Sequence, residues 1–177
     1  MATAISKRTV IHDCTIYPAS GGQPTTMQAA EGVDITLPAI EFESQDIQMM
    51  GTFSMADFTR IGNLEITTNI NADDPNAMRL GVVGEVAEWI VRYIRTVIEP
   101  DNTSRVVGYT VYCKGYVHTI PGTEATPGGE GTGSIAMNSI AYKKEDSDGN
   151  VYYDINRMER RCIINGRDLR SAANALL

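Results

Sequence analysis

Apolar and polar residues alternate over several short stretches of this chain, which is the pattern of half-buried β-strands. The clearest stretch is residues 105–120 (RVVGYTVYCKGYVHTI). Further stretches lie at residues 31–40, 64–70, 134–143, 151–156 and 157–165. The pattern predicts a mainly β fold.

Residues 85–98 (EVAEWIVRYIRTVI) fit two patterns. Their apolar side chains can be placed on one face of a helix, but their β-branched content is high and their alternation also fits a strand. A polar turn sequence at residues 99–102 separates them from residues 105–120. Two such stretches on either side of a short turn form a hairpin, which favours a strand over residues 88–98.

Turn and cap signals separate the strands. Residues 145–150 (EDSDGN) contain an Asp-Gly hairpin turn, and residues 165–166 (NG) form another tight turn. Asp74 and Pro75 are typical of a helix start, so we expect a short helix there. A second short polar helix is expected over residues 168–177.

Two regions lack a regular pattern. Residues 1–30 are mostly polar, and we expect them to form an N-terminal arm. Residues 41–58 carry scattered apolar residues without a helical period, so we expect a long loop that orders against a neighbouring subunit. Methionine adapts to irregular contacts, so the apolar residues of this loop are its candidate interface anchors. They are Met49, Met50, Phe53 and Met55.

Length and composition suit one folded domain over residues 1–177. The formal charge is −7, which argues against binding nucleic acid through its phosphates but leaves open a surface that repels it. The three cysteines are far apart and show no C-x-x-C spacing, which argues against a disulfide framework or a structural zinc site. No signal peptide or membrane-spanning run is seen, so synthesis in the cytoplasm and no membrane association are expected.

Catalytic and ligand-binding patterns are weak. The two histidines lie in no H-E-x-x-H motif, and no G-x-S-x-G motif is present. The acidic turn at residues 145–150 does not match a calcium loop, because Val151 stands where that loop needs glycine. Residues 131–133 (GTG) precede a predicted strand, whereas a dinucleotide site needs a helix. Glu41 and Glu43 would suit a glycosidase, but exposed charge explains them as well. The sequence predicts no enzyme, and no catalytic, metal or cofactor residues.

A series of short motifs follows a set order over residues 33–177. They are Leu37-Pro38, Met49-Met50-Gly51, Lys114-Gly115, Gly129-Glu130, Tyr142-Lys143-Lys144, Tyr153-Asp154-Ile155-Asn156 and Ile164-Asn165-Gly166-Arg167-Asp168. Their order and spacing resemble the major tail tube protein family of contractile-tailed phages and phage-tail-like bacteriocins. The resemblance is most specific over residues 139–170.

The resemblance implies a small β-sandwich or barrel with one or two short helices and long assembly loops or hairpins. Six copies would form a ring, and rings would stack into a hollow tube inside a contractile sheath. Partners would be other copies of the chain, the tail sheath protein, and baseplate or tube-initiator and terminator proteins. DNA would pass through without specific binding during ejection. The protein would be part of the virion tail, made in the host cytoplasm. Gly166, Arg167 and Asp168 would lie near a neighbouring subunit.

Three alternatives stay open. A tube-initiator or distal tail protein, or the tube of a DNA-free injection particle, would share these features. A β-sandwich carbohydrate-active enzyme would instead need a cluster of carboxylates or a metal site in a pocket.

A tube that conducts DNA would need an inner wall that is net acidic or neutral. The segments most suited to line it are residues 45–56, 64–72, 88–98 and 105–118. Arg92 and Arg95 are three residues apart, so a regular strand places them on opposite faces. The inward one is expected to pair with an acid such as Glu88 or a neighbour's carboxylate.

Overall fold

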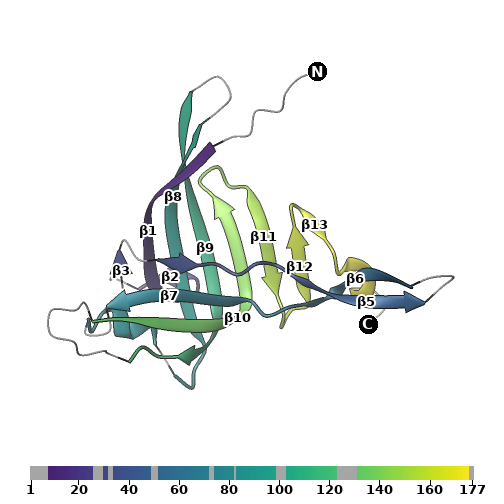
Figure 1. The fold of residues 1–177 in the computed structure, drawn as a ribbon, viewed down its shortest axis with the longest axis horizontal. Helices are drawn as coiled ribbons and strands as arrows, with labels where there is room; N and C mark the ends of the chain where they lie inside the picture. The colour runs from purple at the N-terminus through teal and green to yellow at the C-terminus, as the bar shows by residue number, and fades with distance from the viewer. Residues whose placement is uncertain are drawn as a thin grey trace.

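The computed structural model is built mainly of antiparallel strands (Figure 1), which confirms the predicted fold class. It describes residues 8–25, 30–31, 34–48, 52–71, 74–81, 83–98, 103–122 and 131–175. The strands are β1 (Arg8–Ser20), β2 (Gln23–Pro24), β3 (Ala30–Glu31), β4 (Ile35–Thr36), β5 (Phe42–Gln48), β6 (Thr52–Ile61), β7 (Glu65–Asn71), β8 (Ala87–Ile98), β9 (Ser104–Thr119), β10 (Thr132–Asp146), β11 (Val151–Asn156), β12 (Arg161–Ile164) and β13 (Arg167–Asp168). A short 3-10 helix covers Ala77–Leu80, and α1 covers Ser171–Asn174.

One sheet contains all described strands except β5 and β6. Its main order is β13-β12-β11-β10-β9-β8-β1-β2, with β3 paired to β1 and β4 paired to β7. Strand β8 pairs with β9 along its whole length, from Ala87 opposite Gly115 to Ile98 opposite Ser104. The predicted hairpin is therefore confirmed, and the helical alternative for residues 85–98 is wrong.

Strand β10 bends and belongs to two parts of the sheet. Residues 132–138 pair with β7, residues 141–145 pair with β11, and β9 lies along the other edge. The β9–β10 ladder is interrupted at two places, and such bulges bend a strand. In Figure 1, β7 and the first part of β10 run across the lower ends of β8 and β9. The sheet thereby folds over itself and encloses a core.

The core consists of the inward side chains of the folded sheet. Its largest members are Ile16, Leu64, Ile66, Ile70, Leu80, Trp89, Val91, Val111, Ile135, Met137 and Ile155. Burying one aliphatic or aromatic side chain of this size contributes about 1.5–3 kcal/mol. The Trp89 indole Nε1–H also donates to the carbonyl of Leu80 at 3.0 Å, so the 3-10 helix is fixed to β8.

Three sequence predictions need correction. Residues 8–20 of the expected N-terminal arm form β1, which pairs with β8 over nearly its whole length. Residues 42–48 and 52–61, expected as part of a loop, form the β5–β6 hairpin. Both helices are shorter than expected, because Asp74 forms a local turn with the Asn76 N–H and Asp168 lies in a strand.

Neither helix of the described part is long and apolar enough to cross a membrane. The three cysteines all lie among the described residues and are free. Burial raises the pKa of the half-buried Cys14 thiol to about 11, and the nearby Asp13 carboxylate adds to this shift.

Candidate assembly surfaces

Three strands extend together beyond the core and form a projecting ribbon, made of residues 8–13, 94–98 and 104–108 (Figure 1). Strand β10 ends opposite Tyr109, and β2 and β3 pair with β1 only from Thr15 onward. Among the described residues, both edges of the ribbon therefore have unpaired backbone groups. Such edges are templates for pairing with another chain.

The ribbon also exposes apolar side chains. Val10 and Val106 both lie beside Thr96 and so share one face, with Ile94 on the same face two residues along β8. Val106 is 66% exposed, Val10 49% and Ile94 43%. Grouped apolar exposure of this kind marks an interaction surface.

The β5–β6 hairpin is a second projecting element. In the described chain its strands pair only with each other, and Figure 1 shows them extending away from the main sheet. Phe42 and Phe58 form an edge-to-face contact at 5.2 Å, although Phe58 is 47% exposed. The Arg157 guanidinium donates to the carbonyls of Ile61 and Gly62 and ties the hairpin to the main sheet.

The expected anchor residues of this segment are only partly placed. Phe53 and Met55 lie on β6 opposite Ile47 and Gln45, but their side chains are outside the described structure. Met49 and Met50 lie outside the described residues altogether. Their contact with a neighbouring subunit stays a prediction.

The C-terminal candidates lie at a tight turn. Asn165 and Gly166 both have positive φ, at 48° and 77°, as a type I′ hairpin turn requires. Arg167 is exposed, whereas the half-buried Asp168 accepts the Arg170 N–H at 2.9 Å. The predicted turn is confirmed, and the contact of these residues with a neighbouring subunit stays a prediction.

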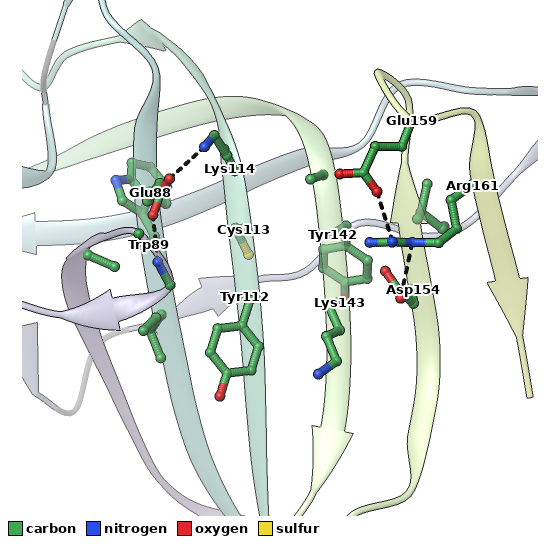
Figure 2. Close-up of a pocket in the computed structure, with 16 residues that line it drawn as sticks. Glu88, Trp89, Tyr112, Cys113, Lys114, Tyr142, Lys143, Asp154, Glu159 and Arg161 are labelled. Carbon is green, nitrogen blue, oxygen red and sulfur yellow. Dashed lines mark hydrogen bonds and ion pairs between the residues drawn. The ribbon is translucent and has the colours of Figure 1, made fainter. Parts of the chain in front are cut away.

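The face of the sheet opposite the core has an open pocket of about 520 Å³ (Figure 2). Its charged side chains come from five neighbouring strands, β8 to β12, and from the turn before β12. They are Glu88, Lys114, Lys143, Asp154, Glu159 and Arg161.

Every charged side chain that lines this pocket takes part in an ion pair. Lys114 Nζ lies 2.7 Å from Glu88, and Lys143 Nζ lies 2.6 Å from Glu145 just beyond the pocket. Arg161 contacts both Asp154, at 3.2 Å, and Glu159, at 2.8 Å (Figure 2). These bonds lower the pKa of Glu88, chiefly through Lys114, and that of Glu145, chiefly through Lys143. The arrangement resembles an ionic surface more than a set of groups poised for proton transfer.

Arg92 and Arg95 lie on opposite faces of β8, as predicted. Arg92 is exposed over the Tyr17 ring at 5.4 Å, and Arg95 is on the core side over the Tyr109 ring at 5.5 Å. Which of the two faces the lumen, and whether its partner is Glu88 or a neighbour's carboxylate, stays a prediction. Glu88 lies on the face of β8 opposite Arg95, where it binds Lys114 and the backbone N–H of Gly22.

The acidic turn between β10 and β11 is built around Asp146. Its carboxylate accepts bonds from the backbone N–H groups of Asp148 and Asn150, from the Asn150 amide and from the Tyr152 hydroxyl. These bonds lower the pKa of Asp146, the Asn150 amide contributing most. Within the described ranges, no group of three or more His, Cys, Asp or Glu side chains could hold a metal ion.

Projecting hairpins with exposed apolar side chains on a mainly β body are characteristic of a protein that associates with other chains. The family model of the phage tail tube protein FII matches residues 26–177, and the chain belongs to that family. It is therefore a structural subunit of a tail tube, a self-assembling component of the virion tail. Strands β1 and β2 precede the matched region. No curated protein matches the chain.

Proposed function

We propose that six copies of this chain form a ring, and that the rings stack into a hollow tube inside a contractile sheath. The tube conducts DNA during ejection and has no enzymatic activity. Its further partners are the sheath protein and the proteins that begin and end the tube. Family membership supports the tube, and the remaining features extend the resemblance of the ordered motifs.

The projecting ribbon is the main observation that supports this proposal. Its open edges and exposed apolar face are unfavourable for an isolated monomer, because both invite uncontrolled association. In a closed ring, each ribbon pairs with a neighbour and no edge remains. Stacking of identical rings through different surfaces then continues along one axis and gives a filament.

The β5–β6 hairpin supports contacts between subunits. A two-stranded hairpin alone is marginally stable in water, so it gains most from a neighbouring surface. We assign it to a contact with a neighbouring copy, with Met49, Met50, Phe53 and Met55 as anchors. The turn at Gly166, Arg167 and Asp168 is a second candidate contact.

The proposal is tested with the concentrated full chain and two matched variants. Negative-stain microscopy of the wild type should show tubes built of stacked rings. Val106→Lys should abolish tubes while the monomer melts normally, because Val106 is largely in solvent and only assembly would bury it. Met158→Lys alters a side chain that is 78% exposed but far from the ribbon in sequence and fold, and should leave tubes intact. Tubes from Val106→Lys equal to those of the wild type would contradict the role of the ribbon.

A further inference from the structure

Two cations on the core side of the sheet share one aromatic surface. The Lys144 ammonium on β10 lies 5.2 Å from the centre of the Tyr109 ring, and the Arg95 guanidinium on β8 lies 5.5 Å from the same ring. Lys144 also lies 5.6–5.9 Å from the rings of Tyr93, Tyr152 and Tyr153. Cation–π contacts of this kind partly compensate the burial of a positive charge.

Neither cation has an ion pair with any described residue. By contrast, five lysine and arginine side chains elsewhere in the described ranges contact a carboxylate: Arg60, Arg105, Lys114, Lys143 and Arg161. The Arg95 Nε atom is buried without a hydrogen-bond partner in the described structure. Asp146, two residues further along the same face of β10, is engaged by its own turn.

The pKa of Lys144 reflects the cost of burying its charge. Burial is the largest cause and lowers the pKa of this ammonium group; the positive charge of Arg95 also lowers it, whereas Tyr153 and Tyr109 act in the opposite direction. Two half-buried like charges without a counter-ion are unfavourable, and an anion placed between them would relieve both.

A pocket of about 490 Å³ opens beside these two side chains, between β1 and β8 on one side and β4 on the other. Its walls are mainly apolar and include Ile35, Leu37 and Val91. Asp34 is the one acid among the described lining residues, and it is exposed and makes no described ion pair with either cation. The pocket is therefore lined by two cations and is large enough for a side chain.

We propose that this pocket, which Lys144 and Arg95 help to line, receives an aspartate or glutamate side chain from a neighbouring copy of the chain. The occupant follows from charge complementarity, since the chain has 22 acidic against 15 basic residues and a formal charge of −7. The inference rests on the proposed tube, in which every subunit meets other copies. A half-buried carboxylate–cation contact of this kind sets the register between subunits and is retained at higher salt than a surface pair.

Substitution separates this contact from a structural role. Lys144→Met keeps the apolar stem inside the tyrosine cluster and removes the charge. The melting temperature of the monomer should stay the same or rise, because an uncompensated half-buried charge is lost. The concentration needed for tube formation should nevertheless rise about tenfold or more, the range expected for a buried charge pair between proteins. Arg95→Met should shift both quantities in the same directions.

Lys143→Met is the matched control, because this neighbouring lysine points to the opposite face and already pairs with Glu145. Its critical concentration should change by less than about twofold, as for an exposed pair. An equal effect of Lys143→Met and Lys144→Met would overturn the proposal. If the wild type forms no tubes at all, the proposed function fails and this inference fails with it. If tubes form and are insensitive to Lys144→Met, only this inference fails.

Cross-linking identifies the occupant. Tubes made from an equal mixture of ¹⁴N- and ¹⁵N-labelled full chains are treated with a water-soluble carbodiimide, which joins an amine directly to a carboxylate. Mass spectrometry should find Lys144 joined to an Asp or Glu of the other isotope. A cross-link only within one chain would overturn the proposal. A third outcome is that phosphate or a short DNA strand stabilises the wild-type monomer but not Lys144→Met, and that no cross-link forms between chains. This outcome would overturn the proposal and assign the pocket to phosphate.

Discussion

At the scale of single residues, Asp146 illustrates how one carboxylate organises a turn. It accepts bonds from two backbone N–H groups and two side chains, all from the segment it closes. These groups stabilise the ionised form, and this is why the pKa lies below its ordinary value of 3.8.

The pH dependence of stability follows from this shift. A carboxyl group with a lowered pKa contributes stability that is complete above 3.8 and is lost as the pH falls through the folded-state pKa, below 3.8. The pKa values of Glu88 and Glu145 are also lowered, from an ordinary value of 4.5. Their contribution to stability is therefore complete above pH 4.5 and is lost as the pH falls below it. Urea unfolding of the wild type should therefore show a clear loss of stability between pH 5 and pH 3. Asp146→Asn should be less stable at pH 7 and lose less on acidification, whereas Asp148→Asn should follow the wild type. Parallel curves for all three proteins would show that Asp146 does not have this role.

Gly166 gives a second prediction at this scale. Its φ of 77° is strained for any residue with a Cβ and most strained for a β-branched one. Gly166→Val should lower stability by about 1–3 kcal/mol and impair or abolish tube formation. Asn165 also has positive φ, which glycine adopts without strain, so the control Asn165→Gly should be tolerated. Thermal melts check the first expectation and microscopy the second; a Gly166→Val protein with unchanged melting and normal tubes would refute it.

At the scale of elements, the bend of β10 depends on close backbone packing against Gly115 of β9. A Cβ added at Gly115 would lie under 3.0 Å from the backbone of Asn138 and Ser139. Gly115→Ala should therefore destabilise the fold by about 1–3 kcal/mol, through forced backbone shifts. Gly108→Ala on the same strand meets only an ordinary contact at 3.8 Å and is the control. Equal unfolding midpoints for the two variants would argue against a tight β9–β10 crossing.

The β5–β6 hairpin gives a prediction about dynamics. Its amides, in residues 42–48 and 52–61, should exchange rapidly in the monomer and slow sharply on assembly, because its strands pair only with each other in the described chain. Amides at the centre of β8 and β9 should be slow in both states, since these strands have partners on both sides. Hydrogen exchange followed by mass spectrometry measures both. Equal protection of the hairpin in monomer and tube would count against its role between subunits.

Elements were predictable from sequence where one face is buried and the other is not. Strands β7 and β9 alternate for that reason, and their predicted positions hold within a few residues. The described parts of β5 and β6 have no buried residues, so no alternation marks them. Strand β1 was missed because a register shift between Ile11 and Asp13 reverses its alternation.

The candidate sites were less predictable. The odd spacing of Arg92 and Arg95 fixed their opposite faces, and the same rule excludes Glu88 as a partner of Arg95, since they are seven residues apart. The tyrosines around Lys144 come from β8, β9 and β11 and meet only through strand register. No local motif could have indicated that cluster.

At the scale of the whole molecule, a folded body carries the projecting ribbon and the β5–β6 hairpin, and the chain has an excess of acidic residues. In a DNA conduit, we expect the acidic excess to keep the inner wall net acidic or neutral, because a positive wall would bind the phosphates. The segments proposed for that wall include residues 88–98 and 105–118. A strongly positive wall would contradict the passage of DNA but not the assembly of the tube.

The most direct test of the tube subunit is a cryo-electron microscopy map of filaments grown from the purified full chain. We predict rings of six subunits stacked around an open channel. The projecting ribbons should join edge to edge within a ring, and the β5–β6 hairpin should contact a neighbouring copy. A chain that stays a compact monomer at high concentration, at every salt concentration and on any baseplate seed, would contradict the account.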